Sequence, residues 1–353
     1  MESFKRILLV RNDRIGDLVL TLPALEAVRA AWPQAHVAVL ASAYAGSLLS
    51  GCRCIDELLV DDRSEGARKL GRRLAAMQFD AALVFNTNTR NCLAVWQAGI
   101  RRRVFWCYKP VGFLLGNTRV AIHRNRPPIH EAEFALAFVR RLGVDVSLAD
   151  LSPRLEIDPA TQRRVAARLR ADLGAGGPLF GVHPGNDRSA YNWPPEHYSS
   201  LIRELSRHAR VMVTGSPAER PLLERVRRQL DSAAKRRVVF YTDFQLLELA
   251  AAISEQTALT VSSTGPMHIA GIVGTPVVAL FSPHPAHVPQ KWSPLGQNHT
   301  LLVAPLGPRE SPRLSHDEGT RLMARINVRQ VLEANVKYAE RDMRRRESPE
   351  RAA

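Results

Sequence analysis

The sequence contains one pattern twice: an apolar run, then a polar loop with a glycine, then a helix-like stretch. It occurs at residues 7–18, where Gly16 and Asp17 follow the apolar run, and again at residues 259–270. Such a strand–loop–helix unit places backbone N–H groups at the mouth of the helix, where negative charge is favoured. One unit in each half of the chain predicts two nucleotide-fold domains that face a shared cleft.

Strand-like and helix-like segments alternate along the chain, a pattern typical of parallel sheets covered by helices on both faces. The first half is expected to hold strands at residues 6–11, 36–41, 57–60, 80–85, 103–105 and 119–121, and helices at 23–31, 66–77, 90–98 and 131–142. A further helix is expected at 159–173, before the second half begins. The second half is expected to hold strands at 179–183, 210–214, 237–240, 258–262 and 277–281, and helices at 195–207, 218–231, 245–253, 266–273 and 326–342. The expected fold class is therefore α/β.

A glycine cluster just before Pro178 indicates a hinge between the two halves. The last residues are rich in arginine and resemble a frayed end. The expected parts are an N-terminal domain at 1–175, a C-terminal domain at 176–325, a closing helix at 326–342 and a basic frayed tail at 343–353.

Composition limits the class of protein. With 353 residues, 45% of them apolar and 24% charged, the chain can bury ample core and is long enough for two domains. It shows no basic-then-apolar signal segment and no apolar run long enough to span a bilayer. The four cysteines lack metal-ligand spacing and are interpreted as packing residues. We therefore expect a cytoplasmic enzyme.

The formal charge of +15 comes mostly from arginine clusters. Such an excess favours polyanionic partners, which include nucleic acid, acidic lipid and phosphorylated glycolipid. The sequence contains no zinc-finger, RNP or basic-zipper pattern, so nucleic acid is the least favoured of the three. The alternative is that most clusters are ordinary solvated helix faces.

The first loop carries a candidate catalytic acid. Gly16 permits a tight turn, and Asp17 follows at the carboxyl end of the first strand, where ligands bind in doubly wound sheets. The helix dipole is expected to keep this carboxylate ionised, although an acid is also common in a first helical turn for structural reasons alone. Arg11, Arg14 and Asp13 flank the loop, where they could contact a phosphate or an acidic acceptor.

The second loop predicts an anion site. Thr264 and Gly265 leave the strand, and Pro266 takes an early helical position where its missing N–H costs nothing. The N–H groups of Met267 and His268 are expected to remain free for an anion, for which a pyrophosphate is the natural guest. The His268 side chain adds a donor, although a lone histidine is more often a structural residue.

Four segments together resemble glycosyltransferase family 9, the ADP-heptose:lipopolysaccharide heptosyltransferases. They are residues 7–25, 181–198, 213–220 and 264–276, and they occur in the family's order over nearly the whole chain. The resemblance implies a GT-B fold with two Rossmann-like domains, in which the N-terminal one mainly binds the acceptor and the C-terminal one the nucleotide-sugar. It also implies an inverting transfer of heptose from ADP-heptose to the lipopolysaccharide inner core, without a metal ion or bound cofactor. The arginine clusters favour peripheral contact with the cytoplasmic face of the inner membrane, where the enzyme would meet its acidic acceptor.

The resemblance also implies roles for single residues. Asp17 would be the general base that takes the proton from the acceptor hydroxyl. The diphosphate of the leaving ADP would be held by Thr264, Gly265, Met267 and His268. This role suits the helix start, because its amides can face the charge that develops on the leaving group. Glu219 would contact the nucleotide ribose.

The chain departs from the family pattern at two positions. Ser263 stands where the family usually has Asp, and Tyr191 stands where the best-known members have a phosphate-contacting Lys. Arg188 or Lys291 could supply the lost positive charge. The donor sugar and base therefore stay open.

Alternatives to heptose transfer also stay open. The chain could use a different nucleotide-sugar donor, or it could be a GT-B epimerase that acts without an acceptor. Such an epimerase would need a second carboxylate near the anomeric carbon, and the first loop offers only Asp13 beside Asp17. The Ser263 and Tyr191 changes suggest a further alternative, a non-catalytic nucleotide-sugar-binding or assembly protein.

Overall fold

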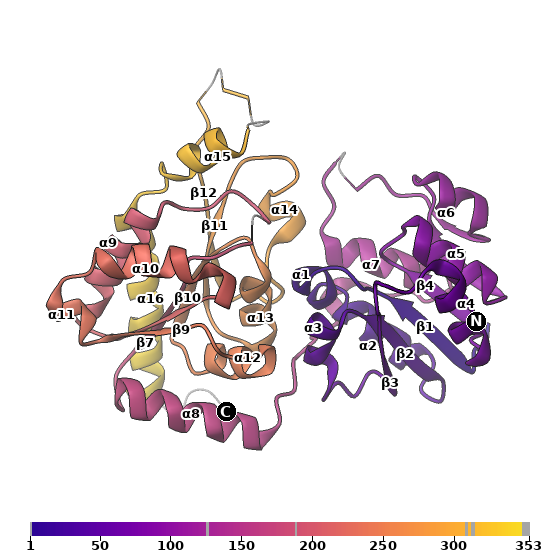
Figure 1. Ribbon diagram of the computed structural model, residues 1–353, viewed down its shortest axis with the longest axis horizontal. Coiled ribbons are helices and arrows are strands. Elements are labelled where there is room, and N and C mark those ends of the chain that lie inside the picture. The colour runs from indigo at the N-terminus through magenta and orange to yellow at the C-terminus, as the bar shows by residue number, and fades with distance from the viewer. Residues whose placement is uncertain (1, 125–126, 188, 308–309, 312–314, 348–353) are drawn as a thin grey trace. The chain divides into compact units, whose positions relative to one another are not determined.

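The computed structural model describes residues 2–124, 127–187, 189–307, 310–311 and 315–347 (Figure 1). The chain divides into two compact units, residues 1–156 and residues 157–353. Each unit holds one parallel sheet of six strands. Among the described residues, no helix is long and apolar enough to cross a membrane.

The sheet of the first unit has the strand order β3-β2-β1-β4-β5-β6. Its strands are β1 (Arg6–Val10), β2 (His36–Ala41), β3 (Glu57–Val60), β4 (Ala81–Val84), β5 (Arg102–Trp106) and β6 (Thr118–Val120). Its helices are α1 (Ile15–Val19), α2 (Leu22–Ala31), α3 (Ala43–Gly46), α4 (Ala67–Ala76), α5 (Thr89–Gln97), α6 (Pro110–Leu115) and α7 (Glu131–Arg140), with 3₁₀ turns at η1 (Ser47–Leu49) and η2 (Leu148–Asp150). The strand order reverses beside β1, which is where doubly wound sheets bind ligands.

The second sheet has the order β12-β11-β10-β7-β8-β9, which is the same doubly wound topology. Its strands are β7 (Leu179–His183), β8 (Arg210–Thr214), β9 (Val238–Tyr241), β10 (Ala258–Ser262), β11 (Val277–Phe281) and β12 (His299–Val303). Its helices are α8 (Pro159–Leu173), α9 (Pro195–Ser206), α10 (Arg220–Arg228), α11 (Ser232–Lys235), α12 (Leu246–Ser254), α13 (Gly265–Val273), α14 (Pro289–Trp292), α15 (His316–Met323) and α16 (Val328–Glu347), with a 3₁₀ turn at η3 (Pro217–Glu219). The order reverses between β7 and β10.

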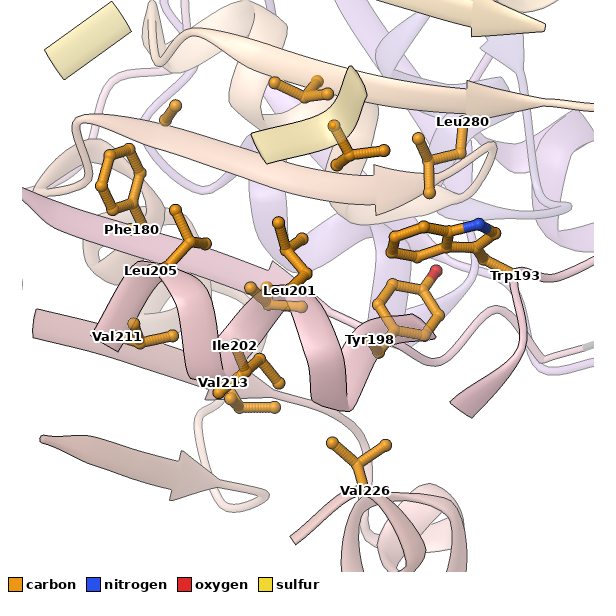
Figure 2. Packing of buried hydrophobic residues seen from close by; sticks show 14 of the residues in the cluster. Phe180, Trp193, Tyr198, Leu201, Ile202, Leu205, Val211, Val213, Val226 and Leu280 are labelled. Atoms are coloured by element: carbon orange, nitrogen blue, oxygen red, sulfur yellow. The ribbon is translucent and has the colours of Figure 1, made fainter. Parts of the chain in front are cut away.

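Burial explains the central strands. The side chains of Ile7 to Val10 in β1 are fully buried because helices cover both faces of a parallel sheet. In the second unit, α9 turns Leu201, Ile202 and Leu205 toward the sheet (Figure 2). Trp193 closes this core from the preceding loop, and its indole N–H donates to the carbonyl of Ile326 at 3.0 Å. The α/β fold expected from the sequence is confirmed.

The structure extends the expected elements at several places. Each expected strand is present with its ends within one residue of the expected bounds. The half-buried edge strand β12 was missed because its sequence begins with His299 and Thr300 and lacks a continuous apolar run. The short helices α3, α6, α11, α14 and α15 were also missed.

The units divide between Glu156 and Ile157, earlier than the boundary expected after residue 175. The reason is α8, which packs with the second unit. Its Val165 and Leu169 lie in one apolar cluster with Leu179, and its Gln162 side-chain amide donates to Ser254 Oγ at 3.0 Å.

The helix expected at 326–342 runs on to Glu347, so the tail expected to fray from residue 343 is helical over its first five residues. Residues 348–353 lie outside the described part of the chain.

Candidate active site

Asp17 lies in the first turn of α1, just beyond the carboxyl end of β1. Its Oδ1 accepts a hydrogen bond from Arg11 Nη2 at 2.5 Å. Arg11 also forms an ion pair with Asp13, with 3.2 Å between Nε and Oδ1. The Arg11 side chain is buried, with 4% of the residue exposed. Its guanidinium therefore fixes the position of both carboxylates of the loop.

A third carboxylate reaches the same guanidinium from far along the sequence. Glu131 begins α7, its side chain is fully buried, and its Oε2 lies 4.0 Å from Arg11 Nη2. Arg124 holds the same Oε2 at 2.5 Å. Sequence reasoning missed Glu131 and Arg124, since no local pattern links them to the first loop. The cluster thus contains three carboxylates and two guanidinium groups.

The electrostatics of this cluster set the pKa of Asp17. Burial is the largest effect, and it raises the pKa of Asp17 to about 6. Arg11 and Arg124 lower this pKa, whereas the negative charges of Asp13 and Glu131 raise it. Burial thus opposes the ionisation that the helix dipole was expected to favour, and the role of the dipole stays a prediction. Asp17 remains mostly ionised at pH 7 and is basic enough to accept a proton.

The two arginines of the first loop differ in exposure. Arg11 was expected to contact an acceptor, but its burial among carboxylates makes it a positioning residue for Asp17. Arg14 is exposed and is accessible to an anionic ligand. The acceptor contacts of Arg14 and Asp13 stay predictions.

A buried polar network supports the loop from below. Asn12 Nδ2 donates to Asp61 Oδ2 at 2.6 Å, and Asn12 Oδ1 accepts from the side-chain amides of Asn86 and Asn91 at 3.0 Å each. Arg90 binds the same Asp61 through two nitrogens, at 2.7 and 3.1 Å. These residues follow β1, β3 and β4, whose carboxyl ends share one sheet edge. The sequence signal for this network is the set of polar residues that directly follow buried strands.

In the second unit, Thr264 precedes α13 in extended backbone, and Gly265 is the first helical residue. The amide of Met267 donates to the carbonyl of Thr264 at 3.1 Å, so this amide is not free, contrary to the sequence expectation. The Met267 side chain is fully buried in the core. The Gly265 amide, at the helix start, has no intrahelical acceptor and suits an anion.

The side chain of His268 is buried and lies near residues 282–292, the Pro/His-rich loop that follows β11. Its ring centroid is 6.4 Å from that of Trp292 in α14. Lys291, which was expected to replace a lost positive charge, is also buried, and its ammonium lies 5.7 Å from the Trp292 ring centroid. Arg188, the other residue expected to supply that charge, lies outside the described residues.

The loop after β7 is tied to the end of β10. Asn192 Oδ1 accepts from Ser262 Oγ at 2.9 Å and from the hydroxyl of Tyr198 at 3.0 Å. Ser189 Oγ donates to the carbonyl of Ser263 at 3.3 Å. Ser263 itself is half-buried at the edge of the anion loop. Both loops therefore sit at the switch point between β7 and β10.

The Tyr191 ring, in the loop after β7, packs against two histidine rings. It meets those of His284 and His287 edge to face, with centroids 5.6 Å apart in both pairs. Gly319 lies against the ring, since a Cβ added there would be 2.4 Å from it. Tyr191 thus joins the loop after β7 to the Pro/His-rich loop.

Glu219 lies beside the end of β7. Its Oε2 accepts from the Ser216 amide at 2.8 Å and from Ser216 Oγ at 3.0 Å, which forms a capping box. A Cβ added at Gly185 would be 2.0 Å from Glu219 Oε1, so the carboxylate covers that glycine closely. His183 Nε2 is 3.9 Å from Oε2, and burial lowers the pKa of His183. The ribose contact of Glu219 stays a prediction.

The chain is similar in sequence to known glycosyltransferases. The sequence profile described as "Glycosyltransferase family 9 (heptosyltransferase)" matches residues 67–317. A putative glycosyltransferase of Haemophilus influenzae is 26% identical over 316 residues, which cover 86% of this chain and 90% of the relative. Lipopolysaccharide heptosyltransferase 2 of Escherichia coli K12 is 26% identical over 292 residues, which cover 79% of this chain and 83% of the relative.

Two solved structures share the fold. The E. coli ADP-heptose lipopolysaccharide heptosyltransferase II superposes with a TM-score of 0.80 at 23% identity, covering 96% of this chain and 99% of that one. A family 9 glycosyltransferase of Veillonella parvula superposes with a TM-score of 0.82 at 22% identity, covering 97% and 99%. The two Rossmann-like domains therefore have the GT-B fold.

Proposed function

Since the chain belongs to glycosyltransferase family 9, the heptosyltransferase family, we propose that it moves a heptose from ADP-heptose to a lipopolysaccharide core or a similar phosphorylated glycolipid. The observation that carries the proposal is Asp17, a buried carboxyl with a pKa of about 6 held by Arg11 at the switch point of the first sheet. This is the site at which a doubly wound domain presents a catalytic group to its ligand.

In the proposed reaction, Asp17 acts as general base. It takes the proton from an acceptor hydroxyl as that oxygen attacks the anomeric carbon from the face opposite the leaving group. The new carbon–oxygen bond forms while the bond to the diphosphate breaks, so the configuration inverts and ADP leaves. A base with a pKa near the working pH suits this step, because it is both ionised and able to hold the proton.

We assign the donor diphosphate to the start of α13. Three groups supply hydrogen-bond donors to the leaving group: the Gly265 amide, the Thr264 hydroxyl and the His268 side chain. The start of the helix favours the negative charge of the leaving group. Ser263 borders this site, and Glu219 contacts the ribose. The acceptor is an anionic glycolipid, with Arg14 among its contacts, and the reaction takes place at the cytoplasmic face of the inner membrane.

The Asp17→Asn variant tests the proposal. Removing a general base lowers turnover by about 10²–10⁴-fold, whereas the binding of ADP at α13 should persist. Turnover is measured with ADP-heptose and a core acceptor, and binding is measured as the upward thermal shift with ADP. Asp56→Asn is the matched control, since Asp56 also pairs with an arginine, at 2.6 Å, but precedes β3 at the opposite edge of the sheet, and this variant should keep the activity of the wild type.

Two results would count against parts of the proposal. Full turnover by the Asp17→Asn enzyme would remove the assigned base. A thermal shift of the wild-type protein with UDP or GDP instead of ADP would change the donor and favour a different nucleotide-sugar.

A further inference from the structure

Helix α6 of the first unit carries large apolar side chains on its outer face. Phe113 is 50% exposed and Leu114 is 75% exposed. Val111 and Leu115, on the opposite side of the helix, pack against the core cluster of the unit. Helix α6 is therefore apolar both on the face that packs against the core and on the face that is exposed.

The orientation of α6 is fixed by a close backbone contact. Gly112 lies on the inner face, where an added Cβ would be 2.2 Å from the carbonyl oxygen of Trp106 and 2.9 Å from Thr87 Cγ2. This contact leaves no room for a larger inner side chain. Phe113 and Leu114 consequently stay on the outside.

Two exposed aromatic side chains lie on the segments next to α6. Tyr108, just before α6, is 46% exposed, and Trp96, on the adjoining helix α5, is 49% exposed. Tyrosine and tryptophan are the residues that favour the boundary between lipid and water, because each combines an apolar ring with a polar group. We call Trp96, Tyr108, Phe113 and Leu114 the α6 surface.

Two exposed cations flank the α6 surface. Residues 81–130 contain eight Arg and Lys residues, of which four pair with carboxylates of other segments. Lys109 and Arg119 are exposed beside α6, and the Arg119 guanidinium lies 4.1 Å from the Phe113 ring centroid. Exposed apolar side chains next to cations match the surface of an anionic bilayer.

We propose that α6 is a peripheral membrane-docking element, which inserts Phe113 and Leu114 into an anionic bilayer while Lys109 and Arg119 contact the lipid headgroups. This inference rests on the proposed function. Helix α6 follows β5, whose carboxyl end lies on the same sheet edge as Asp17. Docking there would present a membrane-embedded acceptor to the first loop.

A second copy of the chain is a poorer occupant for the α6 surface. A symmetric contact would bring each surface against its own copy. Lys109 and Arg119 of the two copies would then lie near one another and repel. Anionic lipid neutralises the same charges.

Vesicle flotation tests the docking element without any substrate. The wild-type protein should float with vesicles that contain phosphatidylglycerol and much less with phosphatidylcholine alone. Phe113→Ser combined with Leu114→Ser should lower partitioning about tenfold or more, because the inserted apolar groups are lost. Val336→Ser combined with Met343→Ser, two exposed apolar residues of α16, is the matched control and should float like the wild type.

A charge variant separates insertion from attraction. Lys109→Glu combined with Arg119→Glu keeps the apolar residues and should lose the preference for phosphatidylglycerol. Equal flotation of the wild type and the Phe113/Leu114 variant would overturn the proposal. So would a wild-type dimer, seen by sedimentation velocity, that the same variant dissociates.

Activity on an acceptor without its lipid chains keeps the two proposals apart. The Phe113/Leu114 variant should turn over such an acceptor at the wild-type rate, because Asp17 is untouched. If flotation behaves as expected but no heptose transfer occurs with any variant, the docking element stands and the reaction assignment fails.

Discussion

At the residue scale, the main feature is a carboxyl that the fold makes more basic. A folded-state pKa above the unfolded value means that the native protein binds this proton more tightly than the unfolded chain does. The contribution of Asp17 to stability is therefore fully present below about pH 4 and is lost as the pH rises through about 6. At neutral pH the ionised Asp17 lowers the stability of the fold, as expected for a group placed for chemistry instead of packing.

The pKa of Asp17 predicts how the reaction rate falls on the acid side of the pH–rate profile. We expect kcat/KM to fall about tenfold per pH unit below pH 6, because only the ionised carboxylate accepts a proton. Arg11→Gln should move this limb to higher pH, since it removes the cation that favours ionisation. Asp13→Asn should move it to lower pH, since it removes a neighbouring negative charge. The pH profiles of the three proteins give the answer, and a limb that neither substitution moves would exclude Asp17 as its source.

At the element scale, the helices that follow the strands are positioned by close contacts with neighbouring loops. Gly271, inside α13, has no side chain, and a Cβ added there would be 2.6 Å from the carbonyl oxygen of Leu295 and 3.0 Å from Pro294 Cβ. Gly274 ends the helix in the left-handed conformation with φ of 84°, where glycine is favoured. The start of α13 thus depends on how closely the helix approaches the 294–295 segment.

Gly271→Ala is expected to displace α13. The backbone oxygen of Leu295 cannot rotate away, so the substitution should lower the free energy of unfolding by about 1–3 kcal/mol. It should also weaken ADP binding, because the helix start moves. Urea denaturation and calorimetric titration measure the two effects.

Gly66→Ala is the control for Gly271→Ala, because nothing lies within 4 Å of a Cβ added at Gly66. Since Gly66 is the N-cap of α4, alanine should cost at most about 1 kcal/mol there and leave ADP binding unchanged. If Gly271→Ala had equally small effects, the close approach would not position α13.

At the scale of the whole molecule, the chain consists of two units of the same topology, between which we propose that the chemistry is divided. Each has a doubly wound sheet, and each has its candidate groups at the carboxyl edge beside the strand-order reversal. The proposed transfer requires the acceptor at Asp17 to reach the donor at α13. The reaction therefore needs a state in which the two edges meet and exclude water.

We predict that nucleotide binding favours such a closed state. Small-angle scattering should give a smaller radius of gyration with ADP than without it, because closure around ligand is a common step in enzymes with two domains. UDP serves as the control, with no change expected at the same concentration. A radius that ADP leaves unchanged would contradict closure.

The sequence alone determined the strands and placed the candidate catalytic acid at the end of the first one. Strands such as β1, β7 and β10 are buried on both faces, so they read as continuous apolar runs whose ends are visible to within a residue. Because the loops that follow parallel strands share an edge, the position of Asp17 was readable too. The resemblance to glycosyltransferase family 9 was likewise confirmed.

Only the tertiary structure decided what surrounds these residues. It buried Arg11 among carboxylates and brought Glu131 to the first loop, although 120 positions of sequence separate the two residues. It turned Phe113 and Leu114 outward through the contact at Gly112. Local sequence patterns indicate which side chains share one face of a helix or strand. Charge pairing and close packing between distant segments depend instead on how the chain folds in three dimensions. For that reason, the sequence located the carboxyl, and the fold set its pKa.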